Sequence, residues 1–128
     1  MRHTLLFISL ALLASSAPAN PLPPATRAEV TALLDALAGS DCEFYRNGRW
    51  YAGSKAASHL QRKLDYLERK DLLTTADSFI ALAATRSSMS GEPYQVRCPG
   101  ETPVPSAEWL NTKLDQIRTH PAEPPDGS

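Results

Sequence analysis

Histidine and cysteine are scarce in this sequence, and their scarcity limits the chemistry that it can perform. The 128 residues include three histidines and two cysteines, and they contain no HExxH motif and no paired CxxC motifs. A protein zinc site usually draws its three or four ligands from histidine, cysteine and carboxylate side chains. The sequence therefore predicts no metal site and no cofactor.

Long apolar runs and a strong charge of either sign are also missing. The formal net charge is −1, and no apolar stretch approaches the roughly 20 residues that span a bilayer. Neither nucleic acid nor an anionic membrane is expected as a partner. Proline is absent between Pro24 and Pro93, so the folded centre should lie between these two residues.

The first 19 residues have the pattern of a cleavable signal peptide. Arg2 and His3 supply a basic start, an apolar run extends from Leu5 to Leu13, and small residues stand at Ala17 and Ala19. Cleavage would leave Asn20 as the first residue. We therefore expect export and no membrane insertion after cleavage.

The remainder has the size of one domain. We predict a Pro-rich lead-in over 20–25, a single domain over 26–118 and a disordered tail over 119–128. Thr26 and Glu29 have the spacing of a capping box at the start of a first helix.

Periodicity and turn residues then predict the order of the elements. Asn47-Gly48 suits the turn of a hairpin formed by 42–46 and 49–51. Helices should follow from Ser54 and from Thr74 or Thr75, then a strand over 94–98 and a last helix from Ser106. This order predicts an α+β fold in which a small three-stranded antiparallel sheet packs with about four helices.

The two cysteines fall at the ends of two predicted strands. Cys42 opens the first strand and Cys98 closes the third, so antiparallel pairing of these strands would bring them close together. In an exported protein such a pair usually forms a disulfide. Free thiols or an intermolecular bond are the alternatives.

Four blocks of sequence carry a resemblance to a known family. They are Phe44–Gly48, Ser58–Leu60 with Lys63-Leu64, Thr75–Ile80 and Ser87–Val96. In their order and spacing, residues 26–118 resemble the YfeK-like family of small periplasmic proteins of unknown function. The resemblance implies a periplasmic location and a shared architecture, and it implies no reaction.

A catalytic reading is possible but has little support. His59 is the one histidine inside the predicted domain, and a triad would need it beside Ser87, Ser88 or Ser90 and a carboxylate such as Glu43. No GxSxG motif is present. We therefore expect a non-enzyme, with a small cell-envelope hydrolase using His59 and a loop serine as one alternative.

A ligand-binding or protein-interaction module is the favoured interpretation. Donor groups gather at the hairpin tip, on one helix edge and in the loop before the third strand: Arg46, Asn47, His59, Lys63, Arg86, Ser88, Ser90 and Tyr94. They suit a periplasmic protein, a peptide or a cell-wall fragment. Arg46 has Glu43 and Asp77 as alternative partners within the chain. Ser90–Tyr94 is also similar to the S-G-x-x-Y loop of periplasmic lysozyme inhibitors, which are all-β barrels, and this is a second alternative.

Overall fold

The computed structural model describes residues 9, 11 and 21–120 of the chain. The predicted signal peptide and the predicted tail beyond His120 therefore lie almost entirely outside the described residues. Within the described residues no helix is both long and apolar enough to cross a membrane.

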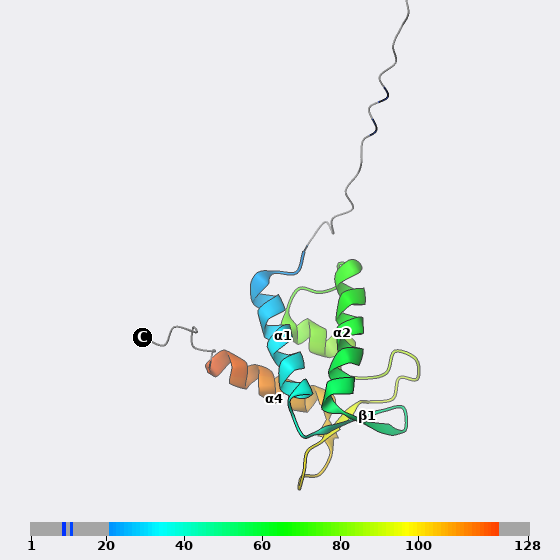
Figure 1. Ribbon diagram of the computed structural model, residues 1–128, viewed down its shortest axis with the longest axis vertical. Coiled ribbons are helices and arrows are strands. Elements are labelled where there is room, and N and C mark those ends of the chain that lie inside the picture. Colours follow the sequence, from blue (N-terminus) through cyan, green and yellow to red (C-terminus); the bar gives the residue numbers. More distant parts are fainter. Residues whose placement is uncertain (1–8, 10, 12–20, 121–128) are drawn as a thin grey trace, which may run out of the picture.

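Four helices and one antiparallel sheet form an α+β fold, as expected (Figure 1). In chain order the elements are α1 (Pro24–Ala38), β1 (Glu43–Arg46), β2 (Arg49–Ala52), α2 (Gly53–Arg69), α3 (Ala76–Ala83), β3 (Gln95–Arg97), β4 (Val104–Pro105) and α4 (Ser106–Thr119).

The sheet has four strands, so the prediction of three is wrong. Its order is β2-β1-β3-β4, and the added strand pairs Val104 with Val96 and Pro105 with Gln95. A two-residue strand that contains proline has no detectable alternation. Proline is tolerated there because β4 is an edge strand, where one side of the backbone needs no partner.

The predicted capping box at the first helix is also wrong. The helix begins two residues earlier, with Pro24 in its first turn, where the missing N–H costs nothing. Thr26 is thereby buried inside the helix, and its hydroxyl donates to the backbone carbonyl of Thr74 at 3.0 Å. The capping box that exists belongs to α3, between Thr75 and Ser78.

One core holds helices and sheet together. The predicted inner faces of α1, α2 and α3 are buried, and Phe44 and Val96 cover the inner face of the sheet. The core also includes Leu22 from the Pro-rich lead-in. Burial of these side chains supplies the main stabilisation of the fold.

A disulfide joins the ends of β1 and β3, as predicted. Cys42 and Cys98 are bonded, with Cα atoms 4.1 Å apart. Glu43 pairs with Arg97 in the sheet, so the bond extends this ladder by one position. It closes a loop across 56 positions of sequence and fixes the hairpin to the third strand.

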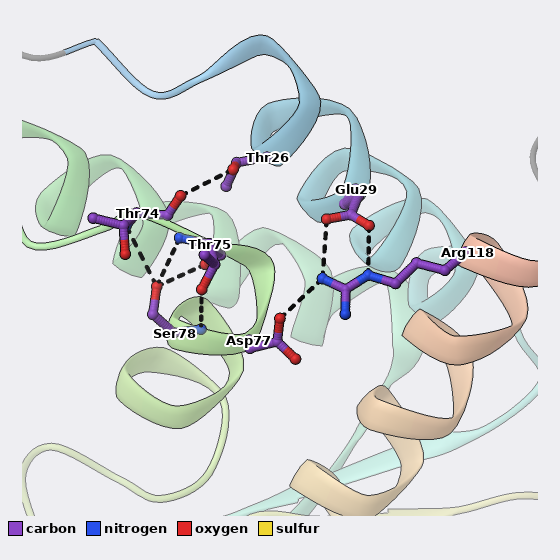
Figure 2. A network of polar contacts seen from close by, with 7 residues as sticks. All are labelled: Thr26, Glu29, Thr74, Thr75, Asp77, Ser78 and Arg118. Carbon is purple, nitrogen blue, oxygen red and sulfur yellow. Dashed lines mark hydrogen bonds and ion pairs between the residues drawn. The ribbon is translucent and has the colours of Figure 1, made fainter.

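Charged side chains join three of the helices at what we call the helix seam, consisting of Glu29, Asp77 and Arg118 (Figure 2). Arg118 on α4 donates to the Glu29 carboxylate at 2.7 and 3.2 Å and to Asp77 at 2.9 Å. These hydrogen bonds lower the pKa of both carboxyl groups. At the helix seam, the positive charge of Arg118 is therefore matched by the carboxylates of Glu29 and Asp77.

Candidate functional site

The hairpin tip is built by two residues in the left-handed region. Asn47 has φ +48° and Gly48 has φ +85°, the positive values that a tight two-residue hairpin loop requires. The turn leaves Arg46 at the end of β1, on the same face of the strand as the buried Phe44. Arg46 therefore lies on the helix-covered face of the sheet.

The loop after α3 meets the hairpin tip through serine and asparagine. Asn47 donates from its amide nitrogen to Ser87 Oγ at 3.2 Å and accepts from Ser90 Oγ at 2.7 Å. In Figure 1 the hairpin and this loop project on the same side of the molecule, beside α2. Asn47 thus holds two segments together that are 40 residues apart in sequence.

The side chains of four residues form a hydrogen-bonded network at this junction. Arg46 lies 3.0 Å from His59 Nδ1, and His59 Nε2 lies 3.3 Å from the Tyr94 hydroxyl. The ammonium of Lys63 donates to the same hydroxyl at 3.3 Å and to the carbonyl of Arg86 at 3.4 Å. This network links the hairpin, α2 and the start of β3.

The protonation state of His59 follows from this geometry. A guanidinium has only donors, so Nδ1 of His59 must accept from Arg46, and the ring hydrogen lies on Nε2. Burial, together with the positive charges of Arg46, Lys63 and Arg62, lowers the pKa of His59 to about 4. His59 is therefore neutral at pH 7 and donates to Tyr94.

The same surroundings shift the pKa values of Lys63 and Tyr94, two other titratable residues of this network. Burial, aided by the charge of Arg46, lowers the pKa of Lys63. Burial raises the pKa of the Tyr94 hydroxyl, although Arg46 opposes that shift. At neutral pH the cluster therefore holds a protonated Tyr94, a neutral His59 and the cations of Arg46 and Lys63.

These residues line a surface hollow of about 170 Å³, which we call the junction hollow. Its wall consists of Arg46, Asn47, His59, Lys63, Ser87, Ser88, Met89 and Tyr94. A smaller space of about 30 Å³ shares Arg46 and His59 with the junction hollow, and Lys55 and Arg62 contribute to its wall.

Six of the eight predicted ligand-binding residues line the junction hollow, and two do not. Arg86 contributes its backbone carbonyl to Lys63, while its exposed side chain is not part of the wall. Ser90 stays outside the wall and stabilises the junction through Asn47.

Sequence reasoning missed Met89 and gave Ser87 no part in the binding site. Ser87 is buried, and its oxygen accepts from the backbone N–H groups of Met89 and Ser90. This pattern is typical of serine at the start of a turn, and the Ser-rich composition of the loop was its signal. The side chain of Met89 is 92 % exposed at the rim of the hollow, and no pattern in the sequence indicates that position.

The carboxylates expected beside Arg46 are bound elsewhere. Glu43 pairs with Arg97 at 2.8 Å, and Asp77 belongs to the helix seam. Both alternative partners proposed for Arg46 are therefore wrong. Among residues 21–120 no carboxylate forms an ion pair with Arg46 or Lys63, or with the neighbouring Lys55 and Arg62.

His59 also lacks the neighbours of a catalytic triad. Both of its ring nitrogens are engaged, one by Arg46 and the other by Tyr94, and neither contacts a serine or a carboxylate. Across the described part of the chain, no three histidine, cysteine, aspartate or glutamate side chains gather where a metal ion would bind.

Comparison with known proteins assigns the chain to a family. Residues 24–118 match the model of a family of unknown function, DUF5329, and the chain belongs to this family. It is also similar to the uncharacterised protein YfeK of Salmonella typhimurium, with 40 % identity over 68 residues. That match covers 52 % of this chain and 55 % of the relative, so the chain matches about half the length of YfeK. The resemblance to the YfeK-like family is thereby confirmed, and no solved structure matches.

Proposed function

We propose that this chain is a periplasmic ligand-binding module whose ligand enters the junction hollow. The supporting observation is the convergence of three separate segments on one hollow: the hairpin tip, α2 and the loop before β3. Binding sites are typically concave and combine apolar walls with a few directed polar groups. Here the polar groups come from Arg46, His59, Lys63 and Tyr94.

Two features support an exported protein. Residues 1–19 have the three-part pattern of a signal peptide. The bond between Cys42 and Cys98 is of a kind that persists in oxidising compartments such as the periplasm. An exported module of this kind would meet peptides, periplasmic proteins and cell-wall fragments as its ligands.

A wider groove elsewhere is a poorer candidate. It lies between α1 and α2 and has about 470 Å³ of space, but its wall is formed mainly by small or uncharged residues with Asp35 as the one charged member. Its polar side chains are those of Asp35, Ser54, Ser58 and Gln61, so it lacks the cations that the junction hollow contains.

Enrichment of natural ligands tests the proposal. The mature protein is mixed with periplasmic extract or digested cell wall, recovered by size exclusion, and its bound molecules are identified by mass spectrometry. We expect one or more species that the wild type and Arg69→Ala enrich and that the double variant Arg46→Ala, Lys63→Ala does not. Arg69 is a matched control because it is an exposed cation on the same helix, about 9 Å along the axis from Lys63.

Circular dichroism checks that the variants remain folded. The proposal fails if no species is enriched over a protein-free control. It also fails if a folded double variant retains the same species as the wild type.

A further inference from the structure

Four side chains of the junction hollow, those of Arg46, His59, Lys63 and Tyr94, offer hydrogens to a ligand and have no free acceptor position. The Tyr94 oxygen accepts from both His59 Nε2 and Lys63, which fills its two lone pairs and leaves its own hydrogen to donate. Lys63 retains one further N–H, because Tyr94 and the carbonyl of Arg86 take the other two. Arg46 uses one nitrogen on His59 and retains the rest of its donors. A ligand that fits these groups must accept hydrogen bonds.

The hollow is also cationic, and no carboxylate is among the described residues of its wall. Arg46 and Lys63 are half-buried, and none of the ion pairs among residues 21–120 includes either. The neighbouring Arg62 adds to the positive field that acts on His59. Half-buried cations are less screened than surface ones, so a negatively charged acceptor is favoured over a neutral one.

The backbone of the loop is not available as a phosphate cradle. Phosphate sites typically use several free backbone N–H groups. In this loop the N–H groups of Met89 and Ser90 donate to Ser87 Oγ, and that of Glu92 donates to Ser90 Oγ. Those of Ser87 and Gly91 donate to backbone carbonyls. Apart from the N–H of Ser88, the available donors are therefore side chains. An arginine fork can bind a carboxylate without a backbone cradle.

The size of the hollow limits the group that enters. Its volume of about 170 Å³ is close to that of a cavity, about 150 Å³, that holds a benzene ring. The residues of its wall include the apolar Met89 and the aromatic rings of His59 and Tyr94. A carboxylate with one small apolar substituent fits this space, while the rest of a longer ligand would extend into solvent.

Building on the proposed function, we propose that the ligand presents a terminal carboxylate on a short apolar residue. Arg46 and Lys63 neutralise the carboxylate, and the hydroxyl of the buried Tyr94 holds Lys63 in place. Neutral His59 holds Arg46 on one side and Tyr94 on the other, and so acts as a positioning residue. The carboxylate has two possible sources, the C-terminal end of a peptide and a free short-chain acid.

Titrations of the folded wild-type protein, followed by calorimetry and by amide shifts in NMR, test this. The probes are acetyl-L-Ala-L-Ala, acetyl-D-Ala-D-Ala, the C-terminal amide of each, propionate and inorganic phosphate. We expect each favoured acid to bind at least tenfold more tightly than its amide, with shifts at Arg46, His59, Lys63 and Tyr94. Preference for the D,D acid indicates a cell-wall peptide, preference for the L,L acid a protein C-terminus, and equal affinity for propionate a free acid.

Variants locate the contact. Arg46→Gln and Lys63→Gln should each weaken the favoured acid about tenfold or more, whereas Arg69→Gln should leave it unchanged. The inference would be overturned if the amides bound as tightly as the acids, or if phosphate bound more tightly than the acids. Both comparisons use the wild-type protein and need no variant. If a neutral species from the extract occupies the hollow and the acids do not, the proposed function stands and the carboxylate inference fails.

Discussion

The junction hollow and the helix seam use arginine in opposite ways. At the seam Arg118 is matched by Glu29 and Asp77, and its hydrogen bonds join three helices. In the hollow Arg46 contacts the neutral ring of His59, and the ion pairs of residues 21–120 leave it without a carboxylate. The carboxylates of the seam satisfy Arg118 within the fold, whereas in our proposal Arg46 takes its acceptor from a ligand.

Removing the disulfide tests whether the two regions belong to one cooperative unit. We expect Cys42→Ala with Cys98→Ala to lower the free energy of unfolding by about 2 to 4 kcal/mol, because the bond limits the unfolded chain across 56 positions. Urea unfolding measures this change. The fluorescence of Trp50 reports on the sheet and that of Trp109 on α4, in variants that keep one tryptophan each. Because the core is a single cluster, the two signals should change together. Two separated transitions would contradict a shared core.

A carboxylate placed in the hollow should give its cations a partner within the protein, as Arg118 has at the helix seam. Ser88 is exposed and lines the hollow, so Ser88→Asp supplies the missing negative charge. We expect binding of the favoured acid to weaken by at least tenfold, which corresponds to about 1.4 kcal/mol. Ser88→Asn has nearly the same shape without the charge and should retain most of the affinity. Equal losses in both variants would mean that shape, not charge, governs binding.

The pH dependence of stability should separate the regions. The pKa of His59 is lowered to about 4 in the folded protein, while in the unfolded chain it has its ordinary value of 6.5. The unfolded state therefore binds more protons between these values, and stability present above pH 6.5 is lost as the pH falls toward 4. We expect this loss to be about 1 to 2 kcal/mol after allowance for the partial exposure of His59.

The seam acts in a lower pH range. The pKa values of Glu29 and Asp77 are lowered in the folded protein, so their contribution is present above the ordinary values of 4.5 and 3.8 and is lost as the pH falls below them. His59→Gln should remove the loss between pH 6.5 and 4 and keep the one below. Urea unfolding at intervals of pH measures both. An unchanged profile in His59→Gln would refute the neutral histidine.

Replacing Arg118 or Arg46 by glutamine should change stability less than the changes described above. We expect Arg118→Gln to lower the free energy of unfolding by about 0.5 to 1 kcal/mol, because its ion pairs are exposed, and to leave ligand affinity unchanged. Arg46→Gln should change stability by less than about 0.5 kcal/mol. Thermal denaturation and the titrations above measure the pair. A larger loss of stability in Arg46→Gln than in Arg118→Gln would reverse the assignment of roles.

Much of the fold could be predicted because its signals are local. The helix faces and the Asn47-Gly48 turn follow from spacing over a few residues. The disulfide between Cys42 and Cys98 followed from the predicted pairing of the strands that they flank. The fourth strand could not be predicted, since a two-residue strand shows no alternation. The start of α1 was placed too late because Thr26 and Glu29 imitate a cap while serving contacts with Thr74 and Arg118.

The candidate site was predicted residue by residue but not as a network. Donors at the hairpin tip, on α2 and in the loop were visible in the sequence. Their meeting on Tyr94, and the use of Glu43 and Asp77 by other arginines, depend on contacts between residues distant in sequence. Sequence spacing therefore indicates which groups are available, and tertiary packing decides which of them remain unpaired.

In our proposal the junction hollow offers donors without carboxylate partners to the carboxylate of a ligand. NMR titration of the wild-type protein with the favoured acetylated dipeptide and with its amide tests it most directly. We expect shifts confined to the hollow, among them His59 and Tyr94, at acid concentrations at least tenfold below those needed for the amide. Equal shifts with acid and amide, or shifts that centre on the helix seam, would contradict it.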